Sequence, residues 1–459
     1  MNFAVVNLGC KVNRVESDDA AARLAACGVE TPEAEADLIV VNTCTVTGEA
    51  EKKTRKAVRR ALRANDRARV LVTGCAAAID AAFYEALGDR VTVVGKAQLA
   101  DAIRDWCEAC SSRSAAGEPA DLANVPAVQA EGPAGLSRGA ACGASETACA
   151  PIEQGDVAPL LHIGSGFRNR VGVKVQDGCD NACTYCIVHV ARGRATSRPA
   201  DEVVRECAAY ARAGAGEIVL TGINLGSYCD GGRRDPSATR LAGLLRRLLD
   251  ETADLHEPGA LPVRFRISSV EPRDVDDELV EVLARAEGRV CRHLHLPLQS
   301  GSTKVLREMA RPYDAAAYVA LVRRLRARVP SIALSTDVIV GFPGETDEDF
   351  EATLSLARAC GFAKMHVFPY SIRAGTPAAA REDQVDASVK AARAARLRAL
   401  SDELRRADYG RRAGTVELAL VEEDGLATVE SHYRVPVPLG AALGSLAPVR
   451  LPERPEEEL

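Results

Sequence analysis

Short runs of β-branched residues alternate with helical patterns along most of the 459-residue chain. Within residues 1 to about 100, strands are expected at 4–8, 38–42, 70–73 and 91–94, with helices between them. Strands that alternate with helices form parallel sheets, because each helix returns the chain to the same edge. We therefore predict a small parallel α/β sheet domain in this part of the chain.

The same alternation returns after an irregular stretch. Helical patterns fill most of the intervals between strand-like runs at 171–175, 217–221, 263–267, 293–298, 333–340 and 364–370. Six such units predict a partial parallel (β/α)6 barrel. One long amphipathic helix is expected over 385–412, and the alternating pattern after Gly414 predicts a short all-β appendage. The fold class is therefore α/β with a small C-terminal β addition.

These patterns divide the chain into four parts. We expect the N-terminal domain at 1–110, a flexible linker at 111–165, the barrel core at 166–400, and the helix end with the appendage at 401–459. The linker is inferred from its Ala, Gly, Ser and Pro content without periodicity. No run approaches the roughly 18 apolar residues of a membrane helix, and a basic signal region is absent. We expect a cytoplasmic protein that does not enter membranes.

Cysteine usage and charge narrow the possible functions. Fifteen cysteines in a long cytosolic chain stay reduced, and their clustering indicates metal binding or catalysis. The net charge of −6 disfavours a uniformly basic nucleic-acid surface, so RNA contact would need local basic patches. Cys27 and Cys207, on expected helix faces, are predicted to be small buried hydrophobic residues.

Three cysteines follow the first barrel strand on one loop, with spacings of four and three. They are Cys179, Cys183 and Cys186. Parallel barrels carry their chemistry at the carboxyl ends of the strands. Zinc usually takes four protein ligands, whereas three thiolates suit a cubane cluster with one open iron, which can chelate S-adenosylmethionine. A zinc site completed by a distant ligand remains the alternative.

Three further cysteines end the first strands of the N-terminal domain. Cys10, Cys44 and Cys75 each follow a separate strand. The carboxyl ends of parallel strands share one edge, so these side chains can converge there. The adjacent Gly9 and Gly74 allow the backbone to approach an inorganic cluster closely. Three ligands again leave one iron free, here for an exogenous sulfur.

Both triplets carry a family resemblance. The Cys-x-x-x-Cys-x-x-Cys run from Cys179, with Tyr185 before its last cysteine, resembles the radical S-adenosylmethionine superfamily signature. Residues 7–13, 41–47 and 176–193 together resemble the methylthiotransferase family. Cys10-Lys-Val-Asn13 and Cys44-Thr-Val-Thr47 are similar to its branch that thiomethylates N6-threonylcarbamoyladenosine in tRNA.

The resemblance implies two 4Fe-4S clusters and S-adenosylmethionine as cofactors. Cys179, Cys183 and Cys186 would hold the radical-generating cluster, and Cys10, Cys44 and Cys75 the auxiliary cluster that delivers sulfur to C2 of the adenine. A second S-adenosylmethionine would supply the methyl group. Thr221 and Gly222 would contact the methionine amino group, and Glu271 the ribose hydroxyls. The implied partners are tRNA and a reductant such as flavodoxin or ferredoxin, and we expect a monomer.

Several interpretations stay open. Relatives in this family act on isopentenyladenosine or on a ribosomal-protein aspartate, and a non-catalytic metal or iron–sulfur electron-transfer protein is a different class of function. The appendage occupies the place of the RNA-binding TRAM domain, but it is short and has few basic residues. Cys107 and Cys110 form a Cys-x-x-Cys pair without an evident partner pair. RNA contact or a solvated helix face is expected for the basic side chains Lys52, Lys56, Arg59, Arg60 and Arg63. Contact with phosphate or carboxylate, or a solvated surface role, is expected for Arg192 and Arg198.

Overall fold

The structure is a computed structural model that describes residues 1–115, 169–232, 234–423 and 425–453. Residue contacts divide these residues into two compact units. The first holds residues 1–7, 19–43 and the described part of 55–161, and the second holds 8–18, 44–54 and the described part of 162–459. Residues 116–165 of the predicted linker lie outside the described residues.

The first unit contains a five-stranded parallel sheet with strand order β2-β1-β3-β4-β5. Every residue of the central strand β3 is buried, as expected for a parallel strand that is covered on both faces. The four predicted strands are confirmed, whereas the two-residue edge strand β2 is too short to leave a sequence pattern. The strands are β1 (Asn2–Asn7), β2 (Val29–Glu30), β3 (Leu38–Thr43), β4 (Arg69–Gly74) and β5 (Val91–Val93).

Helices connect these strands. The structure places them at α1 (Lys11–Ala25), α2 (Gly48–Ala64), α3 (Cys75–Ile79), α4 (Ala81–Glu85) and α5 (Leu99–Ala115). The first residues of α1 and α2, 11–18 and 48–54, are counted with the second unit. Helix α5 continues to Ala115, so it occupies the first five residues of the segment that we expected to be a linker from 111.

A disulfide joins Cys27, after the end of α1, to Cys107 in α5. This corrects two expectations, since Cys27 is not a simple packing residue and the thiols are not all reduced. It also occupies one member of the Cys107/Cys110 pair. This disulfide could not be predicted from the sequence, because the two cysteines are separated by 80 positions and disulfide connectivity does not follow from spacing. Cys207, in contrast, is fully buried as predicted.

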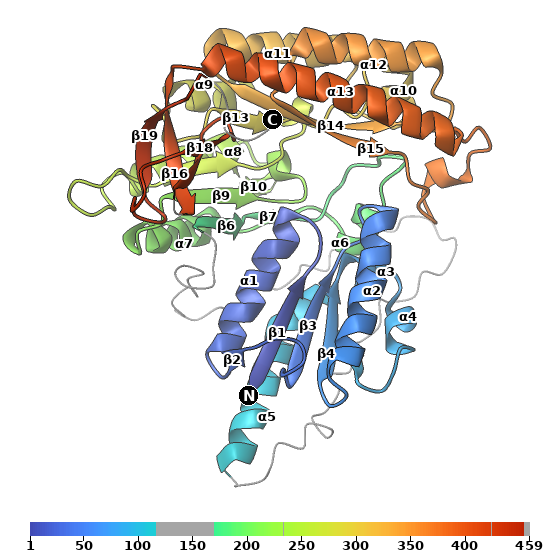
Figure 1. Cartoon of the computed structure of the whole chain (residues 1–459), viewed down its shortest axis with the longest axis vertical. Helices are drawn as coiled ribbons and strands as arrows, with labels where there is room; N and C mark the ends of the chain where they lie inside the picture. Colours follow the sequence, from blue (N-terminus) through green and yellow to red (C-terminus); the bar gives the residue numbers. More distant parts are fainter. Residues whose placement is uncertain (116–168, 233, 424, 454–459) are drawn as a thin grey trace. The chain divides into compact units, whose positions relative to one another are not determined.

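The second unit contains the six predicted parallel strands. Two three-stranded sheets, β12-β9-β6 and β13-β14-β15, are joined by parallel bridges between Phe265 and Val290 and between Ser269 and His295. The strands therefore follow one another as an open, curved sheet, the partial barrel that the alternation predicts (Figure 1). They are β6 (Arg170–Lys174), β9 (Glu217–Thr221), β12 (Arg264–Ile267), β13 (His293–His295), β14 (Ala333–Val340) and β15 (Lys364–Pro369).

Helices follow most of these strands and cover one face of the sheet. They are α6 (Val188–Arg192), α7 (Ala200–Arg212), α8 (Leu241–Glu251), α9 (Asp277–Arg285), α10 (Thr303–Glu308), α11 (Ala315–Arg328), α12 (Asp347–Cys360) and α13 (Ala387–Arg412). Short antiparallel pairs are formed by β7 (Gln176–Asp177) with β8 (Thr196–Ser197) and by β10 (Cys229–Asp230) with β11 (Thr239–Arg240). The expected helix over 385–412 is confirmed as α13, which packs along β15, so the boundary drawn at residue 400 falls inside a helix.

The predicted appendage is a four-stranded antiparallel sheet in the order β18-β17-β16-β19. Its strands are β16 (Val416–Glu423), β17 (Leu426–Val429), β18 (Arg434–Pro436) and β19 (Leu446–Arg450). Arg266 donates to the carbonyl oxygens of Val429 and Glu430, and Arg264 donates to that of Thr428. Both guanidiniums also bind Glu217, and all three side chains are buried. This cluster fastens the appendage to the amino ends of β9 and β12.

Among the described helices, none has the length and apolar character required to cross a lipid bilayer.

Candidate metal centres

The first cysteine triplet lies on the loop between β7 and α6. The backbone N–H of Asn181 donates to Cys179 Sγ and that of Val188 to Cys186 Sγ, both at 3.4 Å. Cys179 N–H donates to the Gly193 carbonyl, which holds the start of the loop against the end of α6. Gly178 has a positive φ of 70°, and a Cβ there would lie 1.9 Å from the Arg194 carbonyl oxygen. The loop therefore requires glycine immediately before its first cysteine.

The thiols of this loop lie close enough to affect one another. Burial, followed by the neighbouring Cys183 and Cys179 thiols, raises the pKa of Cys186 to about 11. Burial also raises the pKa of Cys179. Three thiolates at this place would repel one another, so they require a cationic partner to hold them deprotonated. The donor set and its backbone N–H groups thus fit the iron–sulfur cluster expected there.

Arg311 is a residue of this site that the sequence did not reveal. Its Nη1 donates to Cys183 Sγ at 3.1 Å, and its Nη2 pairs with the Glu271 carboxylate. The Tyr185 hydroxyl lies 3.5 Å from the same guanidinium, whose side chain is 2% exposed. Arg311 therefore links the triplet to the strand end that carries Glu271. A single arginine between helices has no spacing or charge pattern that would have identified it.

Thr221 and Glu271, predicted as S-adenosylmethionine contacts, follow neighbouring strands at the same end of the sheet. Thr221 ends β9 and donates its hydroxyl to the Val173 carbonyl at 3.3 Å. Glu271 follows β12, and burial raises its pKa despite the pairing with Arg311. One oxygen of Glu271 is thus occupied by Arg311, which limits how it can meet a ribose hydroxyl. Their roles in binding stay predictions.

Gly222 lies against the residue that shapes the triplet loop. A Cβ at Gly222 would come within 2.8 Å of Gln176 Oε1. Gln176 Nε2 donates to the Asp177 and Gly178 carbonyls, and its Oε1 accepts from the Asn224 N–H. Glycine at 222 therefore lets β9 approach the segment that leads into the cysteines.

Two polar side chains beside these strand ends have no hydrogen-bond partner among the residues that the structure describes. Asn224 is 4% exposed, and neither its amide nitrogen nor its oxygen is paired. Ser268 follows β12 directly and is also 4% exposed, and its hydroxyl has no hydrogen-bond partner among the described residues. Buried polar groups are normally satisfied, so unpaired ones mark a place where a polar ligand fits. Neither residue was predicted from the sequence, although each lies within three residues of a predicted strand end.

The second triplet follows three adjacent strands. The register pairs Asn7 with Asn42 across β1 and β3, and Thr43 with Gly74 across β3 and β4. Cys44 and Cys75 come immediately after β3 and β4, and Cys10 comes three residues after β1. Cys44 and Cys75 are each 3% exposed, whereas Cys10 is exposed. The three strand ends thus lie at one edge of the sheet, as predicted.

Both glycines beside this triplet have conformations and neighbours that exclude a side chain. Gly9 has φ of 113°, and a Cβ there would lie 2.7 Å from Cys44 Cβ and 2.8 Å from its Sγ. Gly74 has φ of 98°, and its Cβ would lie 2.4 Å from the Thr43 carbonyl oxygen. The backbone before Cys10 therefore packs directly on Cys44.

Polar groups lie beside two sulfurs of the second triplet. Lys96 Nζ donates to Cys75 Sγ at 3.3 Å, a contact that the sequence did not indicate. The Cys10 thiol lies 3.5 Å from Asn13 Oδ1. Lys96 therefore places a positive charge beside one sulfur of this triplet, and Asn13 an amide oxygen beside another.

Arg192 is part of a buried network, so the solvated surface role is wrong, and the carboxylates that it contacts belong to the chain itself. Its side chain is 1% exposed and donates to Glu16, Asp177 and Asn13 at 2.7–3.0 Å. Asp177 also accepts from the Gly178 N–H, next to Cys179. Burial alone would raise the pKa of Asp177, but Arg192 and Lys174 lower it to about 2. Arg192 thereby positions the loop segments next to Cys10 and Cys179.

The predicted basic side chains of α2 are exposed, although two of them contact other residues of the chain. Arg60 pairs with Glu33 at 2.6 Å, and the Arg59 guanidinium lies 5.9 Å from the Phe83 ring centre. Arg198 pairs with Glu206 at 2.6 Å. The exposed members of the α2 set are Lys52, Lys56, Arg59, Arg60 and Arg63.

Two family models match the chain, the radical SAM superfamily over residues 173–357 and the uncharacterized protein family UPF0004 over residues 2–95. The chain is 36% identical over 431 residues to the threonylcarbamoyladenosine tRNA methylthiotransferase MtaB of Bacillus subtilis, covering 93% of this chain and 85% of that protein. It is 33% identical to the protein of the same name from Chlamydia pneumoniae, covering 99% and 96%.

A second group of relatives matches only part of the chain. The tRNA-2-methylthio-N(6)-dimethylallyladenosine synthase of Bacillus subtilis is 41% identical over 270 residues, which is 59% of this chain and 51% of that protein. Among solved structures, the radical S-adenosylmethionine methyltransferase TsrM from Kitasatospora setae aligns with a TM-score of 0.53. It is 16% identical, and the match covers 82% of this chain and 74% of that chain, which supports the fold alone.

Proposed function

Because the chain belongs to the threonylcarbamoyladenosine tRNA methylthiotransferase family, we propose that it converts N6-threonylcarbamoyladenosine in tRNA to the 2-methylthio derivative. The observation that carries this proposal is the extent of the match. Relatives named for this substrate align with 84% to 99% of the chain, whereas the dimethylallyladenosine synthases align with 55% to 59%. The enzyme is thus a radical S-adenosylmethionine transferase.

We assign one 4Fe-4S cluster to each cysteine triplet. Cys179, Cys183 and Cys186 share one loop with backbone donors to two sulfurs, and Cys10, Cys44 and Cys75 follow three neighbouring strand ends. When bound, the cluster on the first triplet with S-adenosylmethionine supplies a carbon-centred radical, and the second cluster supplies sulfur. The residues of the chain hold and orient these groups.

S-adenosylmethionine is assigned to the strand ends beside the first triplet. The predicted contacts Thr221, Gly222 and Glu271 lie there, and the unpaired groups of Asn224 and Ser268 add hydrogen-bonding capacity. Arg311 holds Glu271 and Cys183 in a fixed relation, which makes it a positioning residue. This placement is supported by buried polar groups that are unpaired among the described residues, since such groups normally have a partner.

The remaining partners follow from the substrate. tRNA is polyanionic, and the exposed lysines and arginines of α2 offer positive charge to it. We infer a cytoplasmic site of action, where such tRNA is found, and a monomer that receives electrons from a flavodoxin or ferredoxin. The proposed division of labour gives residues 1–110 the auxiliary cluster and residues 166–400 the radical chemistry.

The substrate is tested by mass spectrometry of tRNA nucleosides from a strain that lacks this gene. The 2-methylthio derivative of threonylcarbamoyladenosine should disappear, the unmodified nucleoside should accumulate, and a plasmid copy should reverse both changes. Persistence of the derivative, or loss of the isopentenyl derivative in its place, would refute the proposed substrate.

The enzymatic class has its own test. Reconstituted protein with reductant and S-adenosylmethionine should form 5′-deoxyadenosine, and Cys183→Ala should abolish this formation. Cys207→Ala is the matched control, because Cys207 is a buried thiol outside both triplets and should keep the activity. A non-catalytic electron-transfer protein would form no 5′-deoxyadenosine at all.

A further inference from the structure

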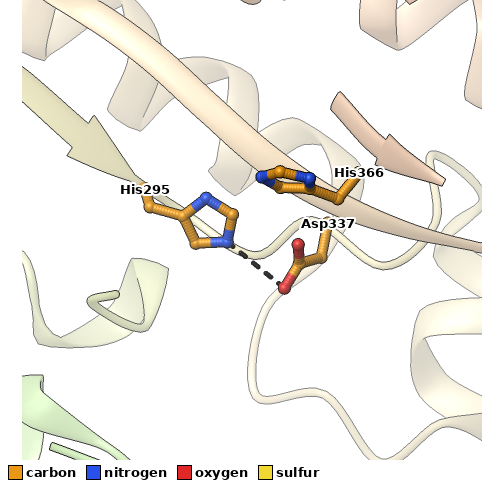
Figure 2. Close-up of side chains that lie close together, drawn as sticks. All are labelled: His295, Asp337 and His366. Atoms are coloured by element: carbon orange, nitrogen blue, oxygen red, sulfur yellow. Dashed lines mark ion pairs between the residues drawn. The ribbon is translucent and has the colours of Figure 1, made fainter. Parts of the chain in front are cut away.

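Three side chains outside the proposed cluster and S-adenosylmethionine sites meet on one face of β13, β14 and β15. The register pairs His295 with Ser335 and Asp337 with His366. Alternate residues of a strand face the same side, so Asp337 lies on the face of Ser335, one step further along the strand. The backbone itself therefore brings His295, Asp337 and His366 together (Figure 2).

The three side chains point toward one another. One possible ligand atom from each lies within 4.8 Å of the others, and His295 Nε2 is 3.2 Å from Asp337 Oδ2. Donor atoms on a common metal ion, at bonds of about 2.0–2.2 Å, lie about 3.0–3.5 Å apart. The His295–Asp337 pair already has this spacing. The ring centre of His366 is 5.7 Å from that of His295, on the same face.

The surroundings orient these groups as they do in metal sites. His295 Nδ1 lies 3.0 Å from the Ser335 hydroxyl, which fixes the imidazole and leaves Nε2 directed at Asp337. A partner on the second ring nitrogen is the usual companion of a metal-binding histidine. His295 is 8% exposed, whereas His366 is exposed and Asp337 is partly exposed. An ion can therefore enter from the His366 side.

We propose that His295, Asp337 and His366 bind one divalent cation of the manganese, iron and zinc class, apart from the two cysteine triplets. Two imidazoles and one carboxylate form the donor set of such ions, and it contains no thiolate. Three protein ligands leave coordination positions open on the exposed side of the strands. The site thus differs in ligand chemistry from both cluster sites, and it stands independently of the tRNA substrate.

Manganese tests the site in the reconstituted protein, with both clusters in their oxidised, EPR-silent state. Titration with Mn2+ alone, followed by the EPR signal of the free ion, should show one bound equivalent per chain. Asp337→Asn and His366→Gln should each weaken this binding by about tenfold or more. His256→Ala is the matched control, because His256 is an exposed histidine outside the set and its loss should change nothing.

Two further measurements keep the result interpretable. Iron and sulfide contents equal to wild type establish that each variant has folded and kept its clusters, and His366→Gln alters an exposed side chain. X-ray absorption at the zinc edge, after zinc replaces manganese, should show nitrogen and oxygen donors without sulfur. The proposal is overturned if wild type binds no saturable Mn2+, which would leave a hydrogen-bonded His–Asp pair only, or if both variants bind like wild type.

Discussion

At the scale of single residues, Gly9 is the most demanding position next to the second triplet. Its φ of 113° is unfavourable for any other residue, and a Cβ would overlap Cys44. We predict that Gly9→Ala displaces Cys44 and prevents assembly of the auxiliary cluster. Iron and sulfide should fall from about eight to about four per chain, measured after reconstitution.

Gly88→Ala provides the control for this prediction. Gly88 has φ of 148°, but a Cβ there has no neighbour within 4 Å. The variant bears the same type of backbone strain without contact with a cysteine, so it should keep about eight irons per chain. Equal iron loss in both variants would attribute the effect to general destabilisation and contradict the specific role of Gly9.

Arg311 carries the second residue-scale prediction. Replacing it by Met leaves the buried Glu271 carboxylate without its partner, which costs about 3–5 kcal/mol of unfolding free energy. The double variant Arg311→Met/Glu271→Leu should recover most of this loss, because no charge is left buried and unpaired. Urea unfolding of the cluster-free protein measures both, and an unrecovered double variant would show that the ion pair is not the cause.

The same residues show what a sequence can and cannot reveal. Cys10, Cys44 and Cys75 were predictable because each one follows a strand, and parallel topology fixes where strand ends lie. Arg311 was not, since its contacts with Cys183 and Glu271 span 128 and 40 positions and depend on loop conformations. Lys96, beside Cys75, was missed for the same reason. Strand-end positions follow from pattern, but side-chain partners do not.

At the scale of elements, strand-like runs were sufficient to predict all six barrel strands, and a segment of strong helix formers with few breakers was sufficient to predict α13. These patterns failed for two-residue strands such as β2 and β7, which are too short to show a period. They also failed to anticipate that Arg264 and Arg266, on a buried strand, bind backbone carbonyls of the appendage. A charged residue within an apolar strand does not by itself indicate which buried group it pairs with.

The cluster formed by Glu217, Arg264 and Arg266 predicts a large effect at this scale. Glu217→Ala leaves two guanidiniums buried without their carboxylate, so it should lower the unfolding free energy by about 3–5 kcal/mol. Glu278→Gln is the control, since Glu278 pairs with Arg246 on an exposed surface and should cost below about 1 kcal/mol. Chemical denaturation measures the unfolding free energy of both variants. Similar losses in the two would show that the buried cluster contributes no more to stability than an exposed ion pair.

Helix α12 begins with a capping box in which Asp349 also binds Lys304 and Ser302. Partial burial would raise the pKa of Asp349, but these partners lower it from 3.8 to about 2. Its contribution is thus present above about pH 4 and lost as the pH falls toward 2. Asp349→Asn should cost about 1 kcal/mol, uniformly from pH 5 to 8. Urea unfolding at several pH values measures this difference in unfolding free energy. If the difference between wild type and Asp349→Asn grows below pH 4, the pKa of Asp349 is not lowered in the folded protein.

At the scale of the whole molecule, the division into two compact units predicts that unfolding is not a single transition. Each unit has its own sheet and buried core, and chains of this size often unfold in separate steps. Calorimetry of the cluster-free protein should resolve two transitions. The Cys27–Cys107 disulfide lies in the first unit and Glu217 in the second, so each offers a way to identify one transition.

The disulfide closes a segment of 80 positions, which in the chain-entropy account stabilises the unit by about 4 kcal/mol. Cys27→Ser should therefore lower only the transition of the first unit under oxidising conditions, and a strong reductant should bring wild type to the same value. Glu217→Ala should lower only the other transition. If either change shifts both transitions equally, the two units unfold together, and the independence inferred from their separate cores is wrong, because neither core then persists without the other.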